Sequence, residues 1–197
     1  IYYKYDDIIK NILDILLTSG LDINMKNGDD AILSHLIYDH NIDLIKILIK
    51  NEKLDINMTI GKYSYLDIAY DNSHYDILEL LLTNFSNILR KYKDNIFLKS
   101  VKDNNLPILK MIIKYNININ KLDELTQDNA LNISTFNDNY EISEILILKN
   151  ISINNINTFN RTPLYNVIYN NNYKLCELLV KSEADINQIC DNYMRTP

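Results

Sequence analysis

Glycine and proline are both scarce in this sequence, with three of each among 197 residues. Because these residues punctuate turns and loops, their scarcity leaves little room for flexible linkers or for the tight hairpins of an all-β fold. Long apolar runs are missing as well: a stretch such as Ile145–Leu148 is far too short to span a bilayer. The sequence therefore argues against an all-β fold and predicts no membrane partner.

An excess of positive charge is also absent. The chain carries 20 Lys and Arg against 26 Asp and Glu, a net charge of −6, and it contains no block of like charges. A protein that binds duplex nucleic acid normally presents a basic stripe that neutralises phosphates. We therefore predict no nucleic-acid partner and no electrostatic preference for a membrane surface.

Cysteine is limited to Cys176 and Cys190, whose separation fits neither a metal site nor a redox motif. We interpret both as free thiols in a reducing compartment, with a disulfide between them as the less favoured alternative. No signal peptide opens the chain, which begins at Ile1 rather than Met, so we expect the natural N-terminus to be missing. The predicted location is intracellular, in the cytoplasm.

Residues arranged for catalysis are not evident in the sequence. The histidines are His35, His40 and His74. No Ser or Cys accompanies them in a recognisable local signature, and the paired carboxylates Asp29-Asp30 have no partner at metal-ligand spacing. Gly28 and Gly61 stand alone and form no phosphate-binding loop. We predict that the chain is not an enzyme and has no catalytic residue, metal site or cofactor.

What the sequence does contain is a repeat. A three-residue motif of the type Asp-Ile-Asn, which we call the phrase, recurs at Asp22–Asn24, Asp55–Asn57, Asn118–Asn120, Ser152–Asn154 and Asp185–Asn187. The final asparagines are 33, 63, 34 and 33 residues apart. The gap of 63 residues holds two units, one with a degraded ending at Asn87–Leu89, so the period is close to 33 residues. Self-similarity at such a period is the signature of a repeat architecture.

Each phrase follows an apolar segment of one design, in which the third position is charged. These segments are residues 12–17, 44–49, 77–82, 108–113, 142–147 and 175–180. A helix that is apolar nearly all round is one that lies between neighbours on both sides. A shorter helix is predicted before each segment, for example at residues 65–70, 130–136 and 164–169.

A polar dipeptide separates the two helices of each pair. The dipeptides are His40-Asn41, Ser73-His74, Asn104-Asn105, Asp138-Asn139 and Asn171-Asn172. A tight turn between helices needs a residue in the left-handed backbone conformation, which Asn, Asp and His tolerate better than most other non-glycine residues. The sequence therefore predicts a helix–turn–helix unit that recurs along the chain.

The last complete unit resembles an ankyrin repeat. The matching segments are Arg161–Tyr165, Asn171-Asn172, Glu177–Leu179 and Ala184–Asn187. The family's Thr-Pro-Leu-His opening corresponds to Thr162–Leu164, with Tyr165 in place of the histidine, and it begins again at Thr196-Pro197. The resemblance extends from about Ile8 to the last residue. It implies an all-α fold: an ankyrin-repeat solenoid of stacked helix–turn–helix units with short hairpin loops.

We predict a single ankyrin-repeat domain over residues 1–197. It comprises a partial repeat 1–24, complete repeats 25–57, 58–89, 90–120, 121–154 and 155–187, and the start of another at 188–197. Because both ends fall within a repeat, we expect the parent protein to continue in both directions and the fragment to be monomeric. The middle repeat lacks an Asp-Ile-Asn ending, so we expect the weakest join at Phe85–Lys93.

The resemblance also implies a function. In the family, hairpin loops and short first helices form a concave face that usually binds a partner. The exposed positions of that face correspond here to six aromatic residues and one arginine: Tyr38, Tyr63, Tyr92, Phe136, Phe159, Arg161 and Tyr169. Tyrosine and arginine are typical anchors of protein interfaces. The alternative is an effect of composition, because a chain with 15 tyrosines places some on exposed positions by chance.

Two functional hypotheses follow. The first is a protein–protein interaction module or scaffold that binds a partner protein through this concave face. The second is a structural spacer within a larger multidomain enzyme, channel or effector whose activity is encoded elsewhere, since a fold does not define a function. Further domains beyond Pro197 would favour the second hypothesis.

A separate resemblance concerns the last asparagine of three phrases: Asn24, Asn154 and Asn187. Each has a leucine eight residues before it, a pattern similar to the ankyrin asparagines that an oxygen-sensing dioxygenase can hydroxylate. The alternative is a purely structural hairpin asparagine. Intact-mass analysis after exposure to such an enzyme tests this hypothesis, because an added oxygen is expected only of a substrate.

Overall fold

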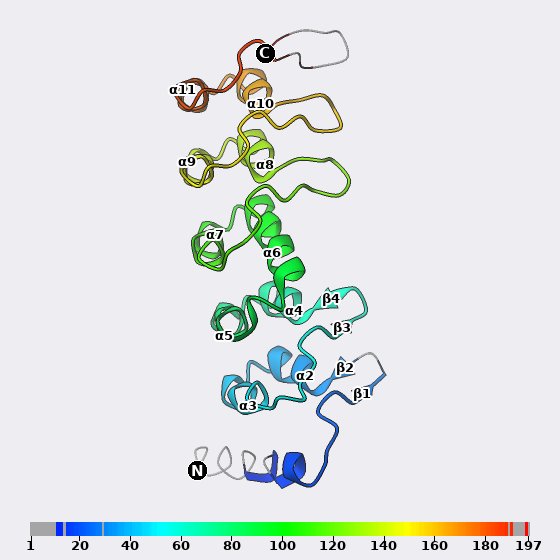
Figure 1. The fold of residues 1–197 in the computed structure, drawn as a ribbon. Coiled ribbons are helices and arrows are strands. Elements are labelled where there is room, and N and C mark those ends of the chain that lie inside the picture. The colour runs from blue at the N-terminus through cyan, green and yellow to red at the C-terminus, as the bar shows by residue number, and fades with distance from the viewer. Residues whose placement is uncertain (1–10, 14, 29, 189, 191–195, 197) are drawn as a thin grey trace. The chain divides into compact units, whose positions relative to one another are not determined.

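The computed structural model describes residues 11–13, 15–28, 30–188, 190 and 196. The chain divides into two compact units, one that ends at Lys93 and one that begins at Asp94. We name them unit 1 and unit 2 and describe each by itself. Figure 1 labels the helices and strands of both.

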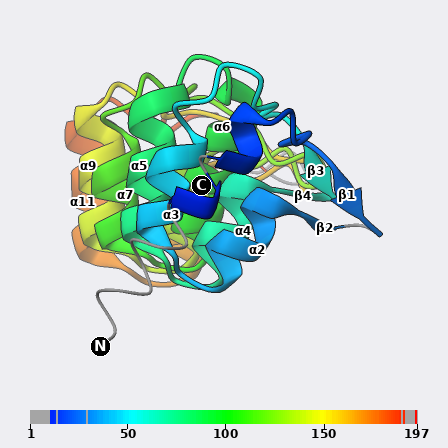
Figure 2. The same cartoon turned by 90° about the horizontal axis from the view of Figure 1, so that it is seen from below.

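In unit 1, helix pairs follow short β-hairpins. The helices are α2 (Ile32–Tyr38), α3 (Ile42–Leu48), α4 (Tyr65–Asp71) and α5 (Tyr75–Phe85). The hairpins pair β1 (Lys26–Asn27) with β2 (Asp30–Ala31) and β3 (Thr59–Ile60) with β4 (Tyr63–Ser64). Gly28 and Gly61 lie in the two turns at φ of 67° and 58°, a conformation that glycine adopts without steric cost. Both hairpins lie on the same side of the unit, beyond α2 and α4 (Figure 2).

Unit 2 is also built from paired helices. They are α7 (Leu106–Ile112), α8 (Ala130–Phe136), α9 (Tyr140–Leu148), α10 (Pro163–Tyr169) and α11 (Tyr173–Lys181). The first member of the first pair is α6 (Arg90–Lys102), which begins in the last residues of unit 1. Loops of residues 121–129 and 154–162 stand where unit 1 has hairpins, and each contains a left-handed residue, Gln127 or Asn160.

The turns within the helix pairs have the predicted conformation. The first residue of each dipeptide has a positive φ: His40 53°, Ser73 59°, Asn104 57°, Asp138 55° and Asn171 56°. In four pairs the second residue caps the next helix by accepting a hydrogen bond from the backbone N–H three residues later; these are Asn41, Asn105, Asn139 and Asn172. The cap satisfies an amide that has no partner within the helix.

Apolar side chains between neighbouring helices form the core of each unit. In unit 1, α2 packs on α3 and α4; in unit 2, α8 packs on α9 and α10. Fully buried examples are Ile45, Leu48, Leu78, Leu81, Leu131, Leu146, Val167 and Leu175. Within the predicted apolar segments the neighbouring helices do not cover every side chain: Ile15 is 62% and Val180 is 48% exposed. Six consecutive helical residues point in all directions, and the neighbouring helices cover only some of them.

The final asparagine of a phrase supports the backbone of the next phrase. Its Oδ1 accepts a hydrogen bond from a backbone N–H in the pairs Asn24–Asp55 (2.8 Å), Asn120–Ser152 (2.7 Å) and Asn154–Asp185 (2.9 Å). In the middle of the chain, where the phrase is degraded, Oδ1 of Asp94 accepts the bond from the N–H of Asn118 at 2.8 Å instead. A carboxylate on α6 thus replaces the missing asparagine.

Helix α6 also replaces a hairpin. Residues 86–89 form a turn and are all that separates α6 from α5. No residue from Phe85 to Asp94 has a positive φ, and the turn leads directly into the helix without an intervening hairpin. The segment Phe85–Lys93, predicted as the weakest join, ends at the boundary between the units. Its strength stays a prediction, as does the division of one domain into the numbered repeats.

Candidate protein-binding groove

A groove of about 520 Å³ lies in unit 2, among α8, α10 and the loops that precede them. Its lining residues are Lys102, Asp123, Thr126, Asp128, Ile133, Phe136, Asn137, Asn157, Phe159, Arg161 and Asn166. Helix α8 contributes Ile133 and Phe136, helix α10 contributes Asn166, and the two loops contribute most of the rest. The groove is therefore a product of stacking two successive helix–turn–helix units.

Asp123 holds the first loop in shape. Its Oδ1 accepts hydrogen bonds from the backbone N–H groups of Leu125 and Thr126, each at 3.0 Å, and Lys102 donates to its Oδ2. Partial burial alone would raise the pKa of this carboxyl, but the bonds from Lys102 and from the two backbone N–H groups hold the pKa well below its usual range. Asp123 is therefore a fixed anion that Lys102 already neutralises.

We predict that the charge of Asp123 stabilises unit 2 at neutral pH. A carboxyl whose pKa is lower in the folded than in the unfolded chain contributes stability above its unfolded pKa of about 4, and this contribution is lost as the pH falls towards the folded value. Asp123→Asn is expected to lower the free energy of unfolding by roughly 1–2 kcal/mol at about pH 7. Urea titrations at about pH 7 and pH 3 measure the free energy of unfolding of wild type and variant, and the difference between the two should be smaller at about pH 3. An equal deficit at both would contradict the role of the charge.

Asn157 shapes the second loop in the same way. Its Oδ1 accepts hydrogen bonds from the backbone N–H groups of Phe159 at 2.9 Å and Arg161 at 3.0 Å. Its Nδ2 donates to Oδ1 of Asp128 in the first loop at 2.7 Å. Asn157 is 8% exposed, so these bonds are shielded from water. The two walls of the groove are therefore tied to each other.

A buried asparagine on α8 connects the loops to the helices. Asn132 is 1% exposed. Its Nδ2 donates to the carbonyl oxygens of Asn155 and Arg161, each at 3.2 Å, and its Oδ1 accepts from Nδ2 of Asn155 at 2.9 Å. Asn166 on α10 donates to the carbonyl oxygen of Asn132 at 3.1 Å. This fully paired network holds the second loop against the inner helices.

Arg161 lies among three aromatic rings at one wall of the groove. Its guanidinium carbon is 5.9 Å from the ring centre of Phe159, 5.5 Å from that of Tyr165 and 5.9 Å from that of Tyr169. These distances are within the range of cation–π attraction. The rings of Tyr165 and Tyr169 are nearly parallel, at 12° to each other. The side chain of Arg161 is half-buried, and its position is set by the rings around it.

The structure brings together the predicted anchors that lie in unit 2. Phe136, Phe159 and Arg161 line the groove, and Tyr169 lies against the guanidinium of Arg161. Phe136 is 58%, Phe159 60% and Tyr169 68% exposed, so the three rings are open to solvent. Whether these residues bind a partner is a separate question, and their role stays a prediction.

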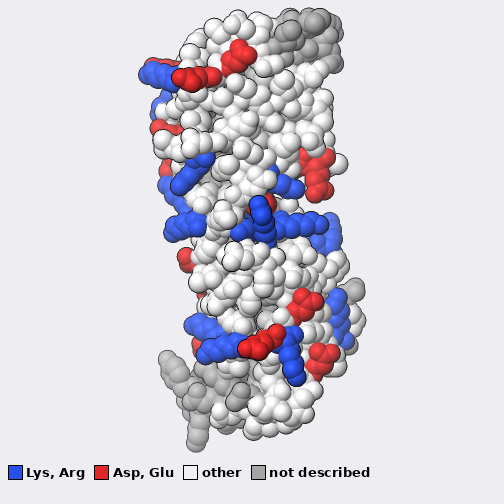
Figure 3. Space-filling model, in the orientation of Figure 1, with Lys and Arg blue, Asp and Glu red and all other residues white. Residues whose placement is uncertain are grey.

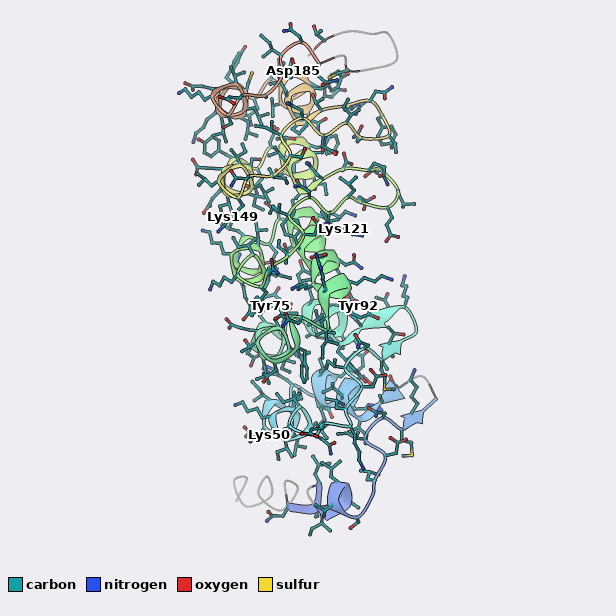
Figure 4. The ribbon with its side chains drawn as sticks, viewed as in Figure 1. Lys50, Tyr75, Tyr92, Lys121, Lys149 and Asp185 are labelled. Atoms are coloured by element: carbon teal, nitrogen blue, oxygen red, sulfur yellow. The ribbon has the colours of Figure 1, made fainter. Side chains whose placement is uncertain are left out.

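The other predicted anchors lie in unit 1. Tyr38 and Tyr63 are 46% and 43% exposed. Tyr92 lies on α6 beside the β3–β4 hairpin (Figure 4) and is half-buried, and its hydroxyl donates to the carbonyl oxygen of Asn57 at 3.4 Å. Tyr92 therefore supports a phrase backbone in addition to any contact with a partner.

Sequence reasoning did not single out the residues that shape the groove: Asp123, Asn132 and Asn157. A signal for two of them was available, because Asp123 and Asn157 each stand three residues after the last asparagine of a phrase. Asn132 occupies the same place in α8 as Tyr165 in α10, the third residue of the helix. Its bonds to residues of the following loop could not be read from this position.

A second hollow of about 360 Å³ adjoins the groove and shares Lys102 and Asp123 with it. Lys121, marked in Figure 4, also lines it, and Nζ of Lys121 is 3.8 Å from the carboxylate of Glu124. Figure 3 shows that Lys and Arg gather at the level of α6 on the face in view, whereas the surface over α8 and α10 is largely uncharged. Lys102 and Lys121 in this hollow each lie beside a carboxylate, that of Asp123 and that of Glu124.

Two histidines of unit 1 form a stacked pair. The ring centres of His40 and His74 are 4.3 Å apart. Nε2 of His40 lies 2.8 Å from the carboxylate of Asp76, and Nδ1 of His74 lies 2.7 Å from the carbonyl oxygen of Ile37. Burial would raise the pKa of Asp76, but the hydrogen bond from His40 contributes to lowering it. These contacts join the two helix pairs of unit 1, which is a structural role.

The asparagines with the hydroxylation pattern take part in the phrase bonds. Nδ2 of Asn24 donates to the carbonyl oxygen of Lys53 at 2.7 Å while its Oδ1 accepts from Asp55. Asn154 accepts the equivalent bond, and Asn187 is exposed. This bonding is what the structural alternative requires of Asn24 and Asn154. Hydroxylation of any of the three stays a prediction.

The helix pairs, their left-handed turns and the protruding loops define a class of protein. The chain belongs to the ankyrin-repeat family: a family model for ankyrin repeats in three copies matches residues 3–92 and 97–190. The predicted fold class is confirmed as an all-α ankyrin-repeat solenoid of stacked helix–turn–helix units with short hairpin loops. Ankyrin repeats are generally protein–protein interaction modules, and the family is generally non-enzymatic.

Among curated proteins, the chain is similar to the putative ankyrin repeat protein R599 of Acanthamoeba polyphaga mimivirus. The two are 29% identical over 147 residues, which cover 75% of this chain and 37% of the relative. The chain thus spans just over a third of the length of that relative. In the part of the chain that the structure describes, no helix is long and apolar enough to cross a membrane. Within the same residues, no group of three His, Cys, Asp or Glu side chains could hold a metal ion.

Proposed function

We propose that this chain is a protein-interaction module and that the groove of unit 2 binds a segment of a partner protein. One observation carries the proposal: Phe136 and Phe159, 58% and 60% exposed, line a hollow whose walls are fixed by buried hydrogen bonds. Rings that are open to water contribute little to the fold. Covering them with apolar groups of a partner is favourable, at about 25 cal/mol for each Å² removed from water.

The loops of the groove favour binding because they are already ordered. Asp123 and Asn157 each fix one loop, and Asn132 fixes the second loop to α8. Ordering a loop at the moment of association weakens binding, so a wall that is held in place beforehand avoids this cost. We expect the occupant of the groove to be a short extended or helical segment.

We predict that Phe136→Ala together with Phe159→Ala abolishes capture of the partner. Truncating an interface anchor costs about 2 kcal/mol or more of binding free energy, whereas the loss of an exposed ring changes stability by about 0.5 kcal/mol or less. The measurement is a pull-down from host lysate with the wild-type chain and the double variant, after circular dichroism has shown that both are folded. Tyr173→Ala is the matched control, because Tyr173 is 85% exposed on α11 and does not line the groove.

The possible outcomes distinguish a wrong location of the interface from the absence of a binding function. A partner recovered equally by wild type and double variant would place the interface elsewhere on the chain. If neither recovers a specific partner, the spacer hypothesis gains. Most of the mimivirus relative lies outside the matched region, so the relative has room for the further domain that this hypothesis requires.

We also propose an intracellular, cytoplasmic location and a monomeric state for the 197-residue chain. Cys176 and Cys190 are both free thiols, which is typical of a reducing compartment. The net charge of −6 disfavours a nucleic-acid partner. Sedimentation of the purified chain tests the oligomeric state.

A further inference from the structure

The strongest feature of the groove beyond its apolar rings is the charge of Arg161. Among the described residues, no carboxylate lies within ion-pair distance of its guanidinium, and no oxygen accepts a hydrogen bond from it. Its described side-chain contacts are with the rings of Phe159, Tyr165 and Tyr169. A guanidinium has five N–H donors in its plane and no acceptor. Ring contacts use its positive charge but leave these donors available.

The other charged groups of the groove are already occupied. Lys102 and Asp123 form an ion pair. Oδ1 of Asp128 accepts the hydrogen bond from Nδ2 of Asn157. The amide of Asn157 is neutral, so Asp128 keeps its negative charge. Arg161 is therefore the one cation of the groove lining, among the described residues, that has no carboxylate partner.

The surroundings of Arg161 fix where its partner must lie. The aromatic rings hold the guanidinium at the groove wall, and Phe136 and Ile133 of α8 lie on the same lining. A ligand that covers these apolar groups brings its own chain past the guanidinium. The ligand group that accepts hydrogen bonds from Arg161 is therefore expected close to an apolar side chain of the same ligand.

We propose that the groove recognises a peptide segment in which an Asp or Glu pairs with Arg161 and a nearby large apolar side chain lies against Phe136 and Phe159. This inference rests on the proposed function and specifies the class of partner. A carboxylate matches a guanidinium in charge and in the geometry of two parallel hydrogen bonds. A phosphate dianion calls for a second free cation, and Lys102 is neutralised by Asp123.

The test begins with random short peptides displayed on phage and selected against the 197-residue chain. An enriched peptide is synthesised with its acidic residue and with the corresponding amide, Glu→Gln or Asp→Asn. Dissociation constants for both peptides are measured by fluorescence anisotropy with wild type, Arg161→Met and Phe136→Ala. Lys174→Met is the matched control: Nζ of Lys174 lies 4.0 Å from the ring centre of Tyr140, so it also removes a cation from a ring, but outside the groove.

The expected result is an enriched set with an acidic residue at a constant spacing from a large apolar one. With wild type, the amide peptide should bind roughly tenfold to a hundredfold more weakly than the acid, since a hydrogen bond to a charged group has that effect. With Arg161→Met, the two peptides should differ by about twofold or less, because the pair is then already broken. Lys174→Met should behave as wild type.

Three results would overturn the inference and leave the proposed function intact. One is a set of peptides whose binding requires Phe136 but that carry no acidic residue, or whose dissociation constants change equally for wild type and Arg161→Met when the acid is replaced by the amide. Another is a phosphoserine version that binds far more tightly than the carboxylate and depends on Arg161. The third is a dimer of the chain that Arg161→Met dissociates in sedimentation, which would make a second copy the occupant. Enrichment of no peptide, or only of peptides insensitive to both Phe136→Ala and Arg161→Met, would remove the inference and the proposed groove together.

Discussion

Replacing Asn132 by leucine is expected to destabilise unit 2 by about 3 kcal/mol, although leucine has the same number of side-chain heavy atoms. The carbonyl oxygen of Asn155 would lose the donor Nδ2 of Asn132, and the buried N–H of Asn129 would lose the acceptor Oδ1 of Asn132. The carbonyl oxygen of Arg161 would lose one of its two donors. Each buried polar group that is left unsatisfied costs about 1–3 kcal/mol. Because the same bonds fix the second loop, peptide binding should fall as well.

The measurement is urea unfolding followed by circular dichroism. Asn137→Leu is the control, because Asn137 also lines the groove but is exposed and one residue beyond the end of α8. It should change the free energy of unfolding by about 0.5 kcal/mol or less. If Asn132→Leu were as stable as wild type, the loop would not depend on this network and the groove could not be regarded as preformed.

Phe97→Ala is the second change with a large expected effect. Phe97 lies on α6 and is fully buried, so its removal leaves a cavity in the core of unit 2. A buried phenylalanine replaced by alanine costs about 3–5 kcal/mol, the sum of the lost burial and the cavity. For a protein whose whole stability is on the order of 5–15 kcal/mol, this is a large fraction.

The chain offers a control of the same residue type. Phe136→Ala makes the identical chemical change at an exposed position, so urea unfolding should show a small difference there and a large one at Phe97. A cost of about 1 kcal/mol or less at Phe97 would contradict the packing of α6 and with it the description of the middle of the chain.

Local chemistry explains which parts of the fold could be predicted. The positive φ at Asn104, Asp138 and Asn171 and the caps formed by the residues that follow depend on the residue itself and its immediate neighbours. The period and the apolar segments follow from the same local patterns. For this reason the helix pairs lie where the sequence placed them, within a few residues at each end.

Features that depend on distant residues were not predicted. The substitution of Asp94 for a phrase asparagine is a bond to Asn118, and nothing near Asp94 in the sequence indicates it. The replacement of a hairpin by the first turns of α6 buries Lys93 and Asp94, which only the tertiary structure shows. Where the repeat motif is degraded, the repeat pattern cannot predict which structure replaces the hairpin.

The candidate site divides in the same way. The sequence by itself determined the repeat and the turn residues, because each follows from residue type and period, whereas the aromatic positions were implied by the resemblance to ankyrin repeats. Only the tertiary structure decided that Phe136, Phe159 and Arg161 share one groove, that Asn132 and Asn157 hold its walls, and that Lys102 is paired while Arg161 is not. The ion pair and the hydrogen bonds that support the loops join side chains from different repeats. The repeat period describes each repeat separately and therefore cannot predict them.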